Sequence, residues 1–145
     1  MKWVKDDGGR AEAGYKGTTS DCVCRAIAIA AQLPYQQVYD ELSALGATGR
    51  TFRGRRGRVR RSHARTGVFK PDIKKYMTNL GWKWTPTMHI GSGCKVHLRD
   101  GELPMGRLVV SVSRHSVAVI DGVIHDLSDP SRDESRCVYG YWSKD

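Results

Sequence analysis

Cys22 stands at a position in the chain that suits a reactive thiol. Ser20-Asp21 provides a helix cap, and the mostly apolar run Cys22–Ala31 predicts a buried helix. The unpaired backbone N–H groups and the positive end of the helix dipole at its first turn lower the pKa of a thiol. We therefore interpret Cys22 as a candidate nucleophile. Cys24 lies about 200° further round such a helix, and we expect it to pack as a small apolar side chain.

A predicted β-hairpin supplies the base and the acid that such a nucleophile requires. Asp121-Gly122 is a strong two-residue turn, and pairing of Ile120 with Val123 across it sets the register of the two arms. This register places His115 and Asp126 on one face as diagonal neighbours, roughly 7 Å apart between backbones. We predict that the Asp126 carboxylate accepts a hydrogen bond from the imidazole of His115 and so orients the ring as a base.

The same register distinguishes Asp126 from the nearby Asp129, because Asp129 and His125 point to the other face. Cys22, His115 and Asp126 are thus expected to form a triad in which the thiol attacks and the imidazole moves the proton. This chemistry predicts a thiol hydrolase that acts on a peptide, isopeptide or related amide bond, with no cofactor. Acyl transfer to an amine uses the same groups and stays open as an alternative.

The predicted helices precede the predicted strands, which indicates an α+β fold. After an irregular lead-in over residues 1–19, helices are expected at Cys22–Ala31, from Pro34 to a stop at Gly46, and from Pro71 to a stop at Gly81. Six later segments are β-prone, namely 82–84, 94–98, 108–113, 116–120, 123–125 and 138–142. We predict a single domain, residues 1–145, in which an antiparallel sheet packs on a central buried helix.

The chain lacks sequence features of membrane association. No apolar run approaches the ~20 residues that span a bilayer, and residues 1–7 lack the apolar stretch of a signal peptide. We therefore expect a cytoplasmic protein with no membrane partner. In that reducing compartment its four cysteines are expected to be free thiols or metal ligands and not disulfides: Cys22, Cys24, Cys94 and Cys137.

A metal site is the alternative chemistry. Cys94 and His97 have a ligand-like spacing, and His89 lies nearby. In a strand, however, Cys94 and His97 would point to opposite faces. We therefore predict no metal site.

Residues 50–65 carry most of the excess positive charge of the chain, whose net charge is +9. This stretch contains no acidic residue and eight arginines, namely Arg50, Arg53, Arg55, Arg56, Arg58, Arg60, Arg61 and Arg65. An Arg-rich loop at about 48–66 can bind nucleic acid or an acidic protein. The second functional hypothesis is therefore a catalytically weak or inactive module that binds through this loop. A solvated surface insertion is the other interpretation, because only Phe52 is available for stacking.

The order of the triad residues resembles the papain-like cysteine peptidase superfamily. Asp21-Cys22 and His115 followed by Val123-Ile124-His125-Asp126 look most like small bacterial members such as the bacteriocin-processing peptidases, and more loosely like transglutaminases. The chain is also similar to phage and bacterial proteins with Gly-Cys-Lys-Val-His-Leu and Val-Ile-His-Asp stretches. The resemblance implies a papain-like fold, in which the nucleophile's helix packs on a sheet carrying the His and then the Asp, and a peptide or protein substrate.

The chain departs from that family at the oxyanion site. Such peptidases usually place a Gln several residues before the nucleophile, whereas residues 17–21 contain none. Thr18, Thr19 or Ser20, together with the backbone N–H of Cys22, are the candidate replacements. Loss of one oxyanion donor can cost about a hundredfold or more in rate, so this departure implies low activity or none.

Overall fold

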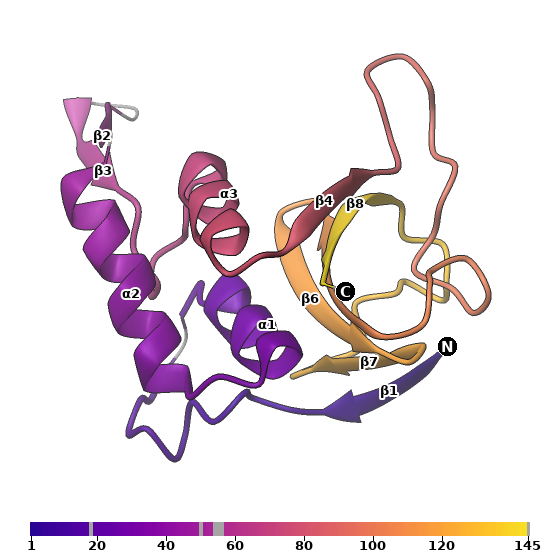
Figure 1. Cartoon of the computed structure of the whole chain (residues 1–145), viewed down its shortest axis with the longest axis horizontal. Coiled ribbons are helices and arrows are strands. Elements are labelled where there is room, and N and C mark those ends of the chain that lie inside the picture. The colour runs from indigo at the N-terminus through magenta and orange to yellow at the C-terminus, as the bar shows by residue number, and fades with distance from the viewer. Residues whose placement is uncertain (18, 50, 54–56, 145) are drawn as a thin grey trace.

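Three helices lie on one side of a six-stranded mixed sheet in the part of the chain that the computed structural model describes (Figure 1). The described residues are 1–17, 19–49, 51–53 and 57–144. The helices are α1 (Cys22–Ala31), α2 (Tyr35–Thr48) and α3 (Lys70–Asn79). The predicted α+β fold class is confirmed, and the first and third helices lie close to their predicted ranges.

The sheet has the strand order β1-β7-β6-β5-β8-β4. Its strands are β1 (Lys2–Lys5), β4 (Lys83–Pro86), β5 (Arg107–Val112), β6 (His115–Ile120), β7 (Val123–Asp126) and β8 (Val138–Ser143). The other neighbouring strands of this sheet are antiparallel, whereas β1 runs parallel to β7 at the edge. The prediction of an antiparallel sheet is therefore wrong at this edge, and residues 2–5 are not part of an irregular lead-in.

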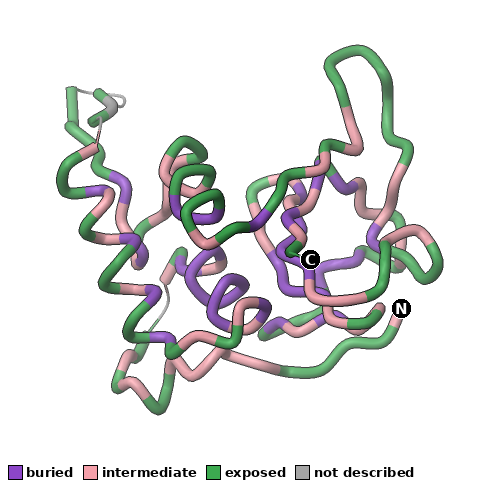
Figure 2. The backbone as a smooth tube through the Cα atoms, viewed as in Figure 1, coloured by how far each residue is buried: buried purple, intermediate pink, exposed green. Residues whose placement is uncertain are grey.

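Helix α1 is buried along almost its whole length, as predicted (Figure 2). Ile27 and Ala30 are fully buried, and they share one apolar cluster with Val109, Ala118 and Trp142 of the sheet. A second apolar cluster, which includes Val110, Val117 and Ile124, also forms around the sheet strands. Burial of the first cluster, which contains the α1 residues, is the main force that holds α1 against β5 and β6.

No helix among the described residues has both the length and the apolar character needed to cross a membrane.

The β6–β7 hairpin has the register that the sequence predicts. Ile120 pairs with Val123, and Ala118 pairs with His125. Both turn residues have positive φ, 48° at Asp121 and 78° at Gly122, as a two-residue hairpin turn of this type requires. The turn chemistry therefore fixes which residues of the two strands face each other.

Helix α2 extends past Gly46, where the sequence predicts a stop. Gly46 is buried, and a Cβ atom at this position would lie 1.7 Å from the backbone oxygen of Ser62. Gly46 therefore allows the chain around Ser62 to pack against the helix, and the helix ends only at Thr48. The glycine serves close approach of two backbones and not helix termination.

The segment 94–98 is not a strand. It forms one isolated bridge, between His97 and Cys137, and the glycines that precede it have positive φ angles that interrupt an extended conformation. A disulfide joins Cys94 to Cys137, with Cα atoms 5.8 Å apart. The expectation that these two cysteines are free thiols or metal ligands is therefore wrong.

The Arg-rich segment forms a short antiparallel ribbon from β2 (Thr51–Arg53) and β3 (Val59–Arg61). The ribbon lies at the end of α2 away from the sheet (Figure 1). Arg53, Arg58, Arg60 and Arg61 are exposed and Arg65 is half-buried. The candidates Arg50, Arg55 and Arg56 lie outside the described residues.

Candidate active site

The fold brings the three residues of the predicted triad together. Cys22 is the first residue of α1, His115 is the first residue of β6, and Asp126 is the last residue of β7. His115 Nε2 lies 2.6 Å from Asp126 Oδ2, which confirms the predicted contact. The Cys22 thiol lies close enough to the His115 side chain and to the backbone N–H of Ser116 for both to lower its pKa. Because Asp126 engages Nε2, Nδ1 is the ring nitrogen left for the thiol.

The pKa values of the thiol and the imidazole move in opposite directions. Burial opposes ionisation of Cys22, but the hydrogen bond and charge of His115, the Ser116 N–H and the charge of Arg25 together hold the pKa of this thiol below its ordinary value. Burial also opposes protonation of His115, but its hydrogen bonds to Asp126 and Cys22 raise its pKa to about 9. The lowered pKa of Cys22 and the raised pKa of His115 together favour a thiolate–imidazolium pair near neutral pH.

The alternative residues of the hairpin do not enter this site. His125 pairs with Asp6, at 3.1 Å between Nδ1 and Oδ2. Asp129 accepts a hydrogen bond from the backbone N–H of Ser131 at 2.9 Å. The register argument therefore selects the correct aspartate as the partner of His115.

Cys24 has the opposite environment from Cys22, although both are free thiols. Cys24 has no exposed surface, and burial together with the charge of Asp21 raises its pKa to about 12. Cys22 is only partly buried. The structure thus confirms that Cys24 packs as an apolar residue, and it leaves Cys22 as the more reactive of the two thiols.

Arg25 is a component of the site that the sequence analysis missed. Its Nε lies 3.3 Å from Asp21 Oδ1, and its Nη1 lies 3.8 Å from Asp126 Oδ1. Both carboxylates are more than 90% buried, and Arg25 itself is 9% exposed. The guanidinium therefore neutralises two buried acids and places a positive charge near the Cys22 thiol. The available signal was an arginine inside an otherwise apolar helix, four residues after an aspartate.

Asp21 occupies the N-cap of α1 but does not act as a side-chain cap, contrary to the prediction. Its carboxylate instead accepts a hydrogen bond of 2.7 Å from the hydroxyl of Tyr35, and it lies 3.4 Å from Nε of Arg10. These partners hold the carboxylate away from the helix terminus. The first-turn N–H groups therefore receive no bond from this cap and remain suited to an oxyanion.

The candidate oxyanion residues before the helix are placed only in part. Thr18 lies outside the described residues, Thr19 is half-buried, and Ser20 is exposed. The backbone N–H of Ser20 donates to the carbonyl oxygen of Arg65 at 2.9 Å. Within the part of the chain that the structure describes, neither the Thr19 nor the Ser20 hydroxyl has a hydrogen-bond partner. An oxyanion role for these hydroxyls stays a prediction.

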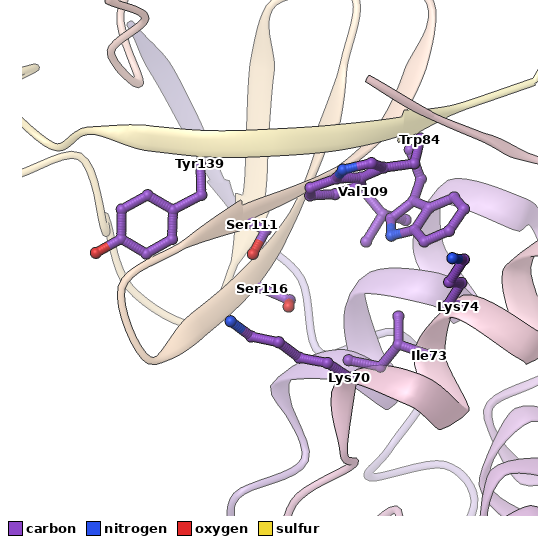
Figure 3. A pocket seen from close by; sticks show the side chains of 9 residues that line it. Lys70, Ile73, Lys74, Trp84, Val109, Ser111, Ser116 and Tyr139 are labelled. Carbon is purple, nitrogen blue, oxygen red and sulfur yellow. The ribbon is translucent and has the colours of Figure 1, made fainter. Parts of the chain in front are cut away.

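A cavity of about 330 Å³ adjoins the site (Figure 3). Ser116 connects the two, because it lines the cavity and directly follows His115 in β6. The cavity lies between α3 and the sheet, and its walls include the indoles of Trp84 and Trp142. Sequence reasoning missed this cavity because its walls come from segments far apart in the chain.

The alternative metal site is not formed by its proposed residues. Cys94 is held in the disulfide, and His97 Nδ1 lies 3.3 Å from a carboxylate oxygen of Glu102. A group of three or more His, Cys, Asp or Glu side chains suited to a metal ion is also not found among the described residues.

Comparisons of the chain with protein-family models, with curated proteins and with solved structures found no match. Function is therefore inferred from the geometry of the site.

Proposed function

We propose that the chain is a cysteine-dependent hydrolase of amide bonds with a papain-like arrangement of its catalytic elements. The observation that carries this proposal is the convergence of Cys22, at the N-terminus of α1, with the His115–Asp126 hydrogen bond of 2.6 Å. The nucleophile's helix packs on β6, the strand that begins with His115, and the neighbouring β7 ends in Asp126. This is the order of elements that the resemblance implies.

The proposed reaction has two halves. The Cys22 thiolate attacks the carbonyl carbon of the substrate, and the carbonyl oxygen takes the negative charge beside the first-turn N–H groups of α1. When the C–N bond breaks, the amine leaves with the proton of the His115 imidazolium, and a thioester remains. His115 then removes a proton from water, whose oxygen attacks the thioester and releases the acid and the thiolate. Asp126 keeps the imidazole oriented in both halves.

Incubation with a complex peptide mixture, followed by sequencing of newly formed termini by mass spectrometry, tests this activity. The unmodified protein is expected to generate new termini, Cys22→Ala to generate none, and Cys24→Ala to retain the cleavage pattern. Cys24→Ala is the matched control because it removes the second free thiol only two residues away. Equal cleavage by Cys22→Ala, or no cleavage by the unmodified protein, would contradict the proposed activity.

We also propose a cytoplasmic location, in which a reduced nucleophilic thiol is maintained. The Cys94–Cys137 disulfide of the structure counts against this location, because disulfides are rare in reducing compartments, and its state in the cell therefore provides the test. Cells lysed into an alkylating agent are expected to yield a chain with four reduced cysteines if the location is cytoplasmic. Recovery of a chain with only two reduced cysteines would contradict this location.

A second candidate function is polyanion binding by the β2–β3 ribbon. Arg53, Arg58 and Arg60 are exposed on it, and the described part of the ribbon contains no acidic residue. We expect the affinity for single-stranded nucleic acid to fall steeply with salt concentration and with Arg58→Ala/Arg60→Ala. Binding that survives both changes would refute this function, and loss of peptide cleavage in the double variant would connect the ribbon to catalysis.

A further inference from the structure

The cavity beside Cys22 has the composition of a pocket for a bulky apolar group. Val109 is 3% exposed and Trp142 is 7% exposed, whereas Trp84 keeps 41% of its surface exposed. The two indole rings lie 5.3 Å apart between centroids, at an interplanar angle of 52°. A volume of about 330 Å³ falls at the lower end of the range for small-ligand pockets. The cavity therefore suits one aromatic or branched aliphatic side chain.

The indole of Trp84 is held in place by its packing. A Cβ atom at Gly140 would lie 2.3 Å from Cζ2 of Trp84, so the missing side chain of this glycine provides the space for the ring. Trp142 is the cross-strand partner of Trp84 in the β4–β8 pair. The aromatic wall is therefore built by the strand pairing, before any ligand binds.

Two lysines give the mouth of this cavity a positive charge. Lys70 and Lys74 are exposed and lie one turn apart on α3. In Figure 3 the Lys70 ammonium lies at the Ser116 end of the cavity, and Lys74 lies at the Trp84 end. Within the described ranges neither ammonium has an ion pair, and no acidic side chain lines the cavity. The carboxylate of Asp72, on the same helix, lies near Gly49 instead.

We propose that this cavity selects peptide substrates in which a bulky apolar residue beside the scissile bond is accompanied by an acidic residue. The inference rests on the proposed hydrolase function. The apolar side chain occupies the space between Trp84 and Trp142, and the carboxylate contacts Lys70 or Lys74. Ser116, which lines the cavity and directly follows His115 at the start of β6, places the occupied pocket beside the reacting atoms.

Four matched sets of peptides test the selectivity. The residues flanking the cleaved bond are varied between Phe and Ala, and a neighbouring residue is varied between Glu and Lys. We expect kcat/KM to be more than about 10-fold higher for Phe than for Ala, because a single methylene group in an apolar pocket is already worth about 10- to 200-fold. Glu is expected to exceed Lys by a smaller factor, because charges at an open rim are screened by solvent and salt.

Charge reversal on α3 tests the substrate preference of the pocket separately from the hydrolase activity itself. Lys70→Glu/Lys74→Glu is expected to reverse the preference for Glu over Lys, and Trp84→Ala to lower the preference for Phe over Ala. Lys75→Glu is the matched control, because Lys75 is exposed on the same helix and does not line the cavity. If Trp84→Ala does not fold, the variants of the exposed lysines still test the pocket.

The outcomes distinguish the pocket from the proposed function. The rate at which neutral iodoacetamide alkylates Cys22 should be the same in the control Lys75→Glu as in the unmodified protein. Cleavage that shows no Phe or Glu preference, or a preference that the lysine reversal leaves unchanged, overturns the pocket while the hydrolase function stands. A complete absence of cleavage by the unmodified protein overturns both.

Discussion

The substitution Asp126→Asn removes the negative charge that stabilises the His115 imidazolium and preserves the shape of the side chain. Asp126 is 7% exposed, so solvent does little to replace this charge. The hydrogen bond and charge of Asp126 are among the interactions that raise the pKa of His115 to about 9, against the effect of burial. Without that charge the pKa of His115 falls, the thiol loses its cationic partner, and the pKa of Cys22 rises.

The size of the effect follows from the strength of the lost hydrogen bond. A hydrogen bond to a charged group contributes about 1.5–3 kcal/mol, and one pKa unit corresponds to 1.36 kcal/mol, so the pKa of His115 should fall by about 1 to 2 units, from about 9 to about 7–8. At pH 8 a large share of the imidazole in Asp126→Asn has therefore lost its proton, and the rate of Cys22 alkylation by iodoacetamide should fall several-fold. The difference between the two proteins should narrow at lower pH, where both imidazoles are protonated, and above the ordinary pKa of a thiol, where both thiols are ionised.

The assay is mass-spectrometric measurement of labelling at Cys22 across pH 5–10. Asp129→Asn is the matched control, since Asp129 is exposed and bonds only to a backbone N–H in the described structure. Equal rates for Asp126→Asn and the unmodified protein at pH 8 would refute the reasoning. So would preferential labelling of Cys24.

Three further changes test how the fold supports the site. Arg25→Met removes the cation that two buried carboxylates share, while Asp21 keeps Arg10 and Asp126 keeps His115 as partners, so we expect a loss of about 1–3 kcal/mol in the free energy of unfolding, measured by urea titration; a change below about 0.5 kcal/mol would contradict the pairing. Gly46→Ala forces a Cβ against the Ser62 backbone and should destabilise the chain by about 1–3 kcal/mol, whereas a stabilising effect would show that α2 tolerates the methyl group. Reduction of the Cys94–Cys137 disulfide, which links residues 43 apart, should cost about 4 kcal/mol, seen as a lower Tm with dithiothreitol; an unchanged Tm would show that the bond contributes little.

Features determined by local chemistry could be predicted from the sequence. The Asp121-Gly122 turn is a two-residue signal, and it fixes the register that brings His115 to Asp126. The apolar pattern of α1 predicts its burial, and its first turn places Cys22. These inferences succeed because each depends on a few residues that are adjacent in the chain.

Features formed by distant segments could not be predicted in the same way. The parallel pairing of β1 with β7 joins residues about 120 positions apart, and nothing in residues 2–5 identifies that partner. Gly46 has the residue type of a helix stop, but the approach of the Ser62 backbone determines its role. The cavity likewise exists only because α3, β4 and β8 meet, so its lysines and tryptophans gave no joint signal in the sequence.

The ionisation state of His115 in the resting protein tests the central claim most directly. An NMR titration of the imidazole is expected to show His115 protonated through neutral pH and losing its proton near pH 9. Because the Cys22 thiolate is one of the groups that stabilise the imidazolium, Cys22→Ala should lower this pKa. A His115 that titrates near its ordinary value of about 6.5, or one whose titration does not respond to Cys22→Ala, would contradict the thiolate–imidazolium pair.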